Sequence, residues 1–148
     1  MRAVLAAYGD ETRCVWLADS FAGVPPPDAA NYKADEGIKL HLFAPMLAVS
    51  EAEVRANFQR YGLLDDQVRF LPGWFKDTLH DAPIDRIAVL RLDGDLYEAT
   101  IQALDALYPR LSPPGVSALL MITTSSKRVG GLSRTTARST EYPRRSLK

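Results

Sequence analysis

Short apolar runs bounded by polar residues recur along the chain and predict strands that are buried on both faces. These runs occupy residues 14–18, 68–71, 87–92 and 116–122. The lone cysteine, Cys14, lies in the first run without a partner cysteine, so we expect it to be a small core residue. Strands with this pattern are typical of a parallel sheet.

Helical spacing predicts three helices around these runs. Residues 1–8 are helix-prone and stop at Gly9. A capping box at Ser50 and Glu53 starts the second helix, and the third begins near Asp95, its expected N-cap. The apolar positions expected to face the core are Val54, Phe58 and Tyr61 in the second helix and Tyr97, Ile101, Leu104 and Tyr108 in the third.

The order of these elements indicates an α/β fold with a mostly parallel, doubly wound sheet and helices on both faces. In such sheets, ligands bind outside the carboxyl ends of the strands. The irregular stretch at residues 23–43 is long for a compact domain, and stretches of that length are usually lids or binding loops. We therefore expect a site where the strand ends and this loop meet.

Composition limits the classes of protein that the chain can belong to. Its 148 residues, 47% of them hydrophobic and 24% charged, suit one globular core, and no apolar stretch is long enough for a membrane span. Without a secretory leader, the expected compartment is the cytoplasm. Residues 1–124 carry 17 acidic and 11 basic side chains, which argues against a nucleic-acid-binding protein. We expect residues 125–148, basic and rich in Ser, Thr and Arg, to form a disordered tail.

Two acids follow strands at positions that suit binding. Asp19, with Ser20 beside it, ends the first predicted strand, where doubly wound nucleotide-binding folds place an acid that accepts hydrogen bonds from ribose hydroxyls. The alternative is that Asp19 or Ser20 merely caps the next helix. Asp93 ends the third strand, where a carboxylate can bind Mg²⁺ or accept a proton, and for Asp95 we favour the helix cap.

The segment after the second strand carries two adjacent aromatic residues. Gly73, Trp74 and Phe75 could place backbone and a ring face against a flat base such as adenine. The alternative, equally weighted for each ring, is that Trp74 and Phe75 pack beneath the sheet. Position in the chain does not decide between these two interpretations.

Four segments closely resemble the macrocin O-methyltransferase family. They are VWLADSFAGVP at residues 15–25, RYGLLDDQVRFLPGWFKDTL at 60–79, LRLDGDLYEAT at 90–100 and LYPRLSP at 107–113. The resemblance covers residues 1 to about 114. It implies a class I methyltransferase fold of the Rossmann type, using S-adenosylmethionine and Mg²⁺ to methylate sugar hydroxyls in macrolide or aminocoumarin biosynthesis.

The same resemblance implies roles for individual residues. Asp19 would bind the cofactor's ribose, Gly73, Trp74 and Phe75 would line its adenine, and Asp93 would be both metal ligand and general base. Residues 24–48 would form a lid over the cofactor and a sugar-bearing acceptor.

The sequence departs from the family pattern at both ends. Family members begin earlier, with a strand and a glycine-containing loop that cradles the cofactor's methionine, so we expect this chain to lack the first strand. Where the family continues with Asp-Asp-Tyr, this chain has LMIT at residues 120–123, and a one-nucleotide shift could restore the missing unit. We therefore expect a frameshift near Pro114, which sequencing of the genomic locus would test, and a partial domain over residues 1–124 with negligible activity alone.

Two other classes of function remain open at this stage. One is a noncatalytic chain that associates with a full-length homologue, since intact members of the family would form homo-oligomers. The other is a fragment of a dinucleotide-binding oxidoreductase, because Asp19 at a strand end serves that fold equally well.

Overall fold

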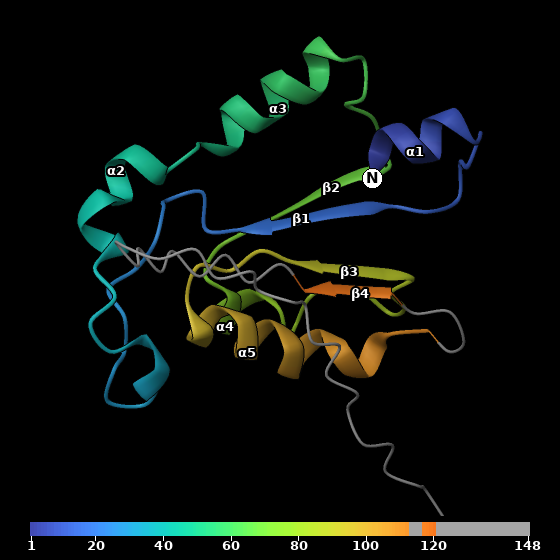
Figure 1. Cartoon of the computed structure of the whole chain (residues 1–148). Coiled ribbons are helices and arrows are strands. Elements are labelled where there is room, and N and C mark those ends of the chain that lie inside the picture. Colours follow the sequence, from blue (N-terminus) through green and yellow to red (C-terminus); the bar gives the residue numbers. More distant parts are fainter. Residues whose placement is uncertain (113–116, 121–148) are drawn as a thin grey trace, which may run out of the picture.

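The computed structural model describes residues 1–112 and 117–120, and its strands form two parallel pairs (Figure 1). Strand β1 (Val15–Asp19) pairs with β2 (Val68–Pro72), and β3 (Val89–Leu92) pairs with β4 (Ser117–Leu120). Figure 1 shows β1 and β3 facing each other as the inner strands of the two pairs. The fold is α/β as predicted, although the described strands form two parallel pairs rather than one sheet.

Helices lie on both sides of the strands (Figure 1). The α-helices are α1 (Arg2–Ala7), α2 (Ala44–Leu47), α3 (Glu51–Arg60), α4 (Phe75–Thr78) and α5 (Tyr97–Leu107). Three short 3₁₀ helices join them, η1 (Lys33–Asp35), η2 (Leu40–Phe43) and η3 (Tyr108–Arg110). The capping box of α3 is confirmed, because the Ser50 hydroxyl accepts from the Glu53 amide and the Glu53 carboxylate accepts from the Ser50 amide.

The main core lies between the strand pair β3–β4 and helix α5. It contains Leu79, which is 1% exposed, with Leu90 and Leu92 of β3. Ala18 of β1 and Leu71 of β2 pack against the same cluster, so both strand pairs share one core.

Helix α5 has its predicted buried face only in part, since Leu104 packs against the core cluster. Its buried residues are Ala103, Ala106 and Leu107, whereas Tyr97 and Tyr108 are more than half exposed. Two alanines let the helix backbone approach the strands closely, and each tyrosine keeps its hydroxyl in water. The spacing predicted the helix correctly but not its rotation about its axis.

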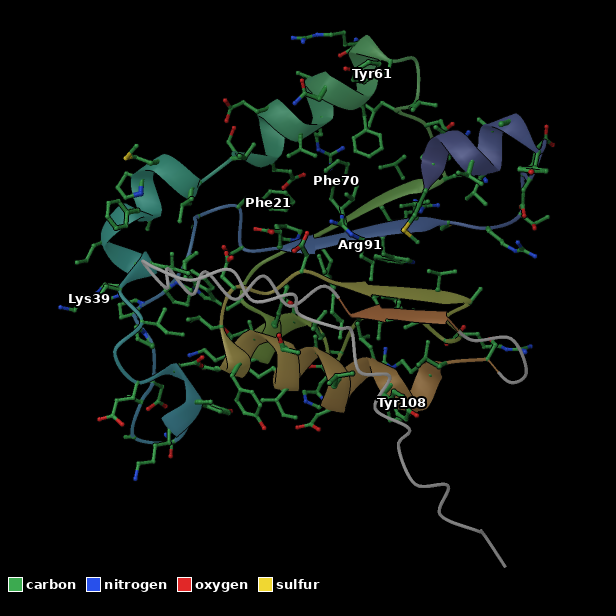
Figure 2. The ribbon with its side chains drawn as sticks, viewed as in Figure 1. Phe21, Lys39, Tyr61, Phe70, Arg91 and Tyr108 are labelled. Atoms are coloured by element: carbon green, nitrogen blue, oxygen red, sulfur yellow. The ribbon has the colours of Figure 1, made fainter. Side chains whose placement is uncertain are left out.

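Helix α3 packs on the first strand pair through aromatic rings (Figure 2). Phe58 of α3 meets Phe70 of β2 edge-on with ring centroids 6.4 Å apart, and Phe21 lies 6.2 Å from the same ring. Arg55 stacks over Phe70 at 3.9 Å. Tyr61, predicted to face the core, is instead 74% exposed because the helix has already ended at Arg60.

Further predictions from the sequence concern Cys14, membrane spans and the C-terminal part of the chain. Cys14 is exposed and precedes β1, so its predicted core position is wrong. Within the described residues, no helix is long and apolar enough to cross a membrane. The predicted last strand is confirmed as β4, but the expected tail at residues 125–148, and the expected frameshift product beyond residue 120, lie outside the described residues.

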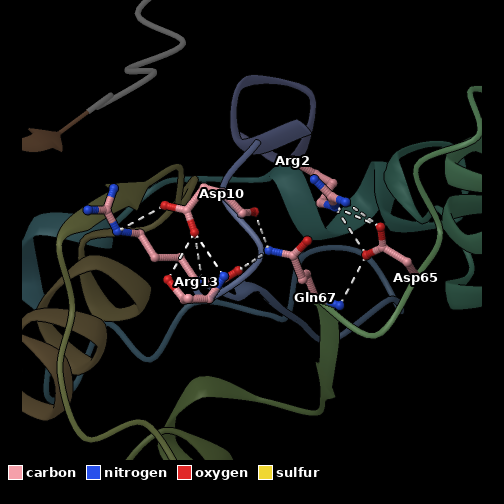
Figure 3. A network of polar contacts seen from close by, with 6 residues as sticks. Arg2, Asp10, Arg13, Asp65 and Gln67 are labelled. Carbon is pink, nitrogen blue, oxygen red and sulfur yellow. Dashed lines mark hydrogen bonds and ion pairs between the residues drawn. The ribbon is translucent and has the colours of Figure 1, made fainter. Parts of the chain in front are cut away.

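A polar network fastens α1 and the start of β1 to the loop before β2 (Figure 3). The Arg2 guanidinium donates to both Asp65 carboxylate oxygens, with 3.0 Å from Nε to each. The Gln67 amide donates to the backbone carbonyls of Asp10 and Arg13 at 2.8 and 2.7 Å. Together these bonds set the position from which β1 enters its pairing with β2.

Acid should loosen this network. The hydrogen bond from Arg2 holds the pKa of Asp65 below its usual range, and the amides of Arg13 and Thr12 do the same for Asp10. Because these pKa values are lower in the folded state, the two carboxylates stabilise the fold at pH values above about 4, the ordinary pKa of aspartate. This stability is lost as the pH falls through the pKa of the folded state. We expect the midpoint temperature of thermal unfolding to fall as the pH is lowered below about 4. The fall should be less steep in Asp65→Asn. An equal effect of Asp66→Asn, which changes an exposed neighbour, would contradict this explanation.

Candidate functional site: a pocket at the carboxyl ends of three strands

A pocket of about 430 Å³ opens where β1, β2 and β3 end. Its volume lies within the range of small-molecule sites. The lining includes all six residues predicted from the sequence, which are Asp19, Ser20, Gly73, Trp74, Phe75 and Asp93. The chain thus brings the predicted residues into one pocket, as expected for parallel strands whose carboxyl ends share an edge.

At the end of β1, Asp19 and Ser20 shape a tight turn. The Asp19 carboxylate accepts from the Phe21 amide at 2.7 Å, which accommodates the positive φ of 54° at Phe21. The Ser20 hydroxyl accepts from the Ala22 amide and donates to the Gly23 carbonyl, both at 3.1 Å. Neither residue caps a helix, because none follows directly. No described residue donates to the second Asp19 oxygen, Oδ2, which is therefore available to a ligand.

At the end of β2, Gly73 occupies a position that suits glycine alone. Its φ is +134°, and a Cβ there would lie 2.6 Å from the Thr78 side chain. Its amide donates to the Asp19 carbonyl at 2.9 Å and so joins the ends of the two strands. Trp74, 37% exposed, lines the pocket, whereas Phe75 lines it and also packs against the core. Packing of Phe75 against the core agrees with one interpretation, whereas the contact with adenine stays a prediction.

Replacing Gly73 with alanine should destabilise the fold by about 2 kcal/mol or more, because backbone strain and the contact with Thr78 add. Gly9→Ala is the matched control, since Gly9 has a φ of +64° with nothing within 4 Å of the added Cβ. Gly9 has a left-handed φ that other residues can adopt, so the comparison measures the added strain and clash at Gly73 together. Urea unfolding measures the free energy of unfolding of both variants. Equal losses would mean that a Cβ at Gly73 does not clash with Thr78.

At the end of β3, two carboxylates share the segment that we call the acidic turn, residues 93–95. The Asp93 carboxylate is about half exposed and accepts from Arg91 Nη2 at 2.5 Å. Burial against the pocket wall raises the pKa of Asp95, and the charges of Asp93 and Asp19 raise it further. The acidic turn and the end of β1 therefore lie close enough to influence each other.

Asp95 is not the helix cap that the sequence predicted. The N-cap of α5 is Leu96, which offers no side-chain cap, and the first free amides of the helix are bound by Asp35 from a distant loop. Asp95 lines the pocket instead. The only signal in the sequence that Asp95 could line the pocket was its spacing of two residues from Asp93. No signal in the sequence indicated that Asp35 binds the start of α5.

The long loop closes one side of the pocket. Val24, Pro25, Pro26 and Asp28 belong to the lining, and the lid expected over residues 24–48 stays a prediction. Gly23, with a φ of +84°, sits so close to the Ala44 carbonyl that a Cβ would meet the oxygen at 2.6 Å. The two ends of this loop are therefore packed against each other.

The donor set suits a cationic ligand. Asp19, Asp93 and Asp95 contribute negative charge, and burial first, then the repulsion from Asp93 and Asp19, raises the pKa of Asp95. A sulfonium or a divalent cation would relieve this repulsion. Among the residues that the structure describes, no three His, Cys, Asp or Glu side chains are grouped as a complete metal site.

The chain is similar in sequence to known O-methyltransferases. The 8-demethyl-8-(2,3-dimethoxy-alpha-L-rhamnosyl)-tetracenomycin-C 4'-O-methyltransferase of Streptomyces olivaceus is 63% identical over 115 residues, which cover 78% of this chain and 44% of that protein. The demethyldecarbamoylnovobiocin O-methyltransferase of Streptomyces niveus is 56% identical over 115 residues, which cover 78% of this chain and 44% of that protein. The chain spans less than half the length of these relatives.

Solved structures agree with the observed fold. The O-methyltransferase NovP superposes with a TM-score of 0.75 at 56% identity, over 78% of this chain and 48% of NovP. The calicheamicin methyltransferase CalS11 shares the fold at 20% identity, with a TM-score of 0.57 over 78% of this chain and 49% of CalS11. The profile of the family described as Macrocin-O-methyltransferase (TylF) matches residues 1–123. The chain therefore belongs to the macrocin O-methyltransferase family.

Proposed function

We propose that the pocket binds S-adenosylmethionine and that the chain is part of a domain that transfers its methyl group to a sugar hydroxyl of a secondary metabolite. The observation that carries this proposal is the convergence of Asp19, Trp74 and the acidic turn on one pocket. The relatives' names support the reaction, since the Streptomyces proteins are O-methyltransferases and one acts on a rhamnosyl-bearing compound.

Each part of the cofactor has a chemically matched partner. The free oxygen of Asp19 would accept hydrogen bonds from the ribose hydroxyls, with Ser20 holding the turn. Gly73, Trp74 and Phe75 would line the adenine, with the exposed face of Trp74 against the base. The acidic turn would face the positively charged sulfonium.

Methyl transfer then needs a base and a held acceptor. When bound, S-adenosylmethionine supplies an electrophilic methyl group, and Mg²⁺ held by Asp93 with Asp95 would lower the pKa of the acceptor hydroxyl. Held by Asp19, Gly73 and Trp74, the donor would supply the methyl group to the sugar oxygen and would leave with the electrons of its carbon–sulfur bond. Asp93 accepts the hydroxyl proton. Asp95, whose pKa is already raised, is the second candidate for this proton.

We also propose that the two strand pairs belong to one Rossmann-like sheet with β1 and β3 flanking the position of a further strand. The pairs share one core through Ala18 and Leu71, and their inner strands face each other in Figure 1. The expected negligible activity of the chain alone stays a prediction, so binding is the first property to measure.

A noncatalytic role has support from one exposed surface. Leu42, Phe43 and Met46 of η2 and α2 are 64%, 55% and 83% exposed, which is unusual for large apolar side chains grouped together. This surface would suit association with a full-length homologue. Size-exclusion chromatography of the mixture should show a shared peak, and separate elution at micromolar concentrations would reject this candidate.

Calorimetric titration with S-adenosylmethionine, with and without Mg²⁺, tests the proposed function. We expect saturable binding at one site per chain, and tighter binding of an added sugar acceptor when Mg²⁺ is present. A parallel titration with NAD addresses the oxidoreductase alternative. Heat from NAD but none from S-adenosylmethionine would overturn the proposal.

Trp74 should report this binding. Truncating it to alanine should weaken S-adenosylmethionine about tenfold, since stacking of a base on an aromatic ring contributes about 1–3 kcal/mol. Ligand should also change the intrinsic fluorescence, and Trp74→Phe should remove most of that change, leaving Trp16 as the remaining tryptophan. A response that persists in Trp74→Phe would mean that the base binds elsewhere.

A further inference from the structure

Asp35 is the one charged side chain that is buried among residues 1–112, with 1% of its surface exposed. Its two carboxylate oxygens accept hydrogen bonds from the amides of Tyr97 at 2.7 Å and Glu98 at 2.9 Å. These partners are the first two residues of α5, more than 60 positions further along the chain. Asp35 thus performs for α5 the task that an N-cap side chain usually performs from within the helix.

The helix that Asp35 caps begins directly after the acidic turn. Only Leu96 separates Asp95 from the first residue of α5, so the position of the helix start sets the direction of both carboxylates. Gly94 is packed tightly against this first turn, where a Cβ would lie 3.1 Å from the Ala99 side chain. Any movement of the helix start would therefore move the acidic turn with it.

Asp35 also belongs to the loop that walls the pocket. It ends η1, inside the lid segment of residues 24–48, and the Tyr32 ring lies 6.5 Å from the Tyr97 ring beside it. The same loop supplies Pro25, Pro26 and Asp28 to the pocket. One carboxylate therefore connects the lid to the strand end that carries Asp93.

This connection is strong for a physical reason. Free amides at a helix start carry the positive end of the helix dipole, and a carboxylate that accepts from two of them makes charge-assisted hydrogen bonds. If the lid segment moved away from the start of α5, both amides would lose their hydrogen-bond acceptor and the Asp35 carboxylate would be exposed to water. The described residues offer no other side chain to these two amides.

We propose that Asp35 is a positioning residue that locks the lid segment onto the start of α5 and thereby holds the acidic turn against the methyl-donor pocket. The effect on the ligand rests on the proposed function, whereas the lock itself does not. Asp35 touches no reacting atom and acts through the backbone of α5.

Hydrogen–deuterium exchange on the ligand-free chain tests the lock. In Asp35→Ala we expect the amides of residues 24–48 and of Tyr97 and Glu98 to exchange about 10- to 100-fold faster. The core amides of β3 should stay protected. Asp35→Asn, which keeps one acceptor oxygen, should restore part of the protection. Glu36→Gln changes an exposed neighbour whose side chain makes no hydrogen bond among the described residues, and it should behave as wild type.

Two outcomes would overturn the inference. One is unchanged exchange in the lid and at Tyr97 and Glu98 in Asp35→Ala. The other is an equal increase throughout the core, because that pattern means general destabilisation rather than a local lock.

Titration of the same variants with S-adenosylmethionine adds the link to function. We expect Asp35→Ala to bind about tenfold more weakly and Asp35→Asn to lie between it and wild type. Wild-type chain that fails to bind, with local exchange changed as expected, would reject the proposed function and leave the lock standing. Wild-type binding that Asp35→Ala leaves intact would reject the positioning role alone.

Discussion

Truncating Leu79 to alanine is expected to lower the free energy of unfolding by about 3 kcal/mol, the largest effect of any single change considered for this chain. Leu79 is 1% exposed at the centre of the cluster that joins β3 and α5. The change removes buried methyl groups and leaves a cavity in a core that both strand pairs share. Domains of this size are stable by only about 5–15 kcal/mol, so much of the stability would be lost.

Urea unfolding followed by circular dichroism measures this loss. Leu42→Ala is the matched control, because the same truncation at a side chain that is 64% exposed should cost well under 1 kcal/mol. Equal losses for the two variants would mean that Leu79 does not occupy the centre of the core.

Asp19→Ala is expected to weaken S-adenosylmethionine binding about 10- to 100-fold, because hydrogen bonds from ligand hydroxyls to a charged carboxylate contribute about 1.5–3 kcal/mol. The variant also loses the bond to the Phe21 amide, so the turn could relax. Asp19→Asn separates the two effects, since its amide oxygen can still accept from Phe21 while the charge is lost.

The controls for this prediction lie outside the pocket. Asp66→Ala changes an exposed acid in the loop before β2 and should leave the affinity unchanged. Thermal unfolding should show that Asp19→Asn is as stable as wild type. Wild-type affinity in both Asp19 variants would exclude this carboxylate from the binding site.

Much of the candidate site could be predicted from the sequence because parallel strands bring their carboxyl ends together. Asp19, Gly73 and Asp93 each follow a short apolar run, and the pocket joins all three. Local patterns were sufficient for this, since each strand and the residue after it are neighbours in the chain.

What could not be predicted depends on contacts between distant segments. Nothing near Asp35 indicates that its carboxylate meets the amides of Tyr97 and Glu98, and nothing near Asp95 shows that the cap of α5 comes from elsewhere. The error at Asp95 followed from this, because an acid just before a helix is usually its cap.

The rotation of α5 and the start of β1 also depend on contacts between distant segments. The spacing in α5 identified a helix, but the choice between its alanine and tyrosine faces depended on how closely the strands approach. Cys14 was misplaced by a single residue, because the end of an apolar run does not mark where pairing begins.

Ultraviolet crosslinking of S-adenosylmethionine labelled in its methyl group, followed by peptide mapping, tests most directly whether this pocket holds the methyl donor. We predict saturable labelling of peptides that contain residues 19–26 or 73–76, reduced by Asp19→Ala and by excess unlabelled cofactor. Labelling confined to α1 or α3, or labelling that does not saturate, would contradict the account.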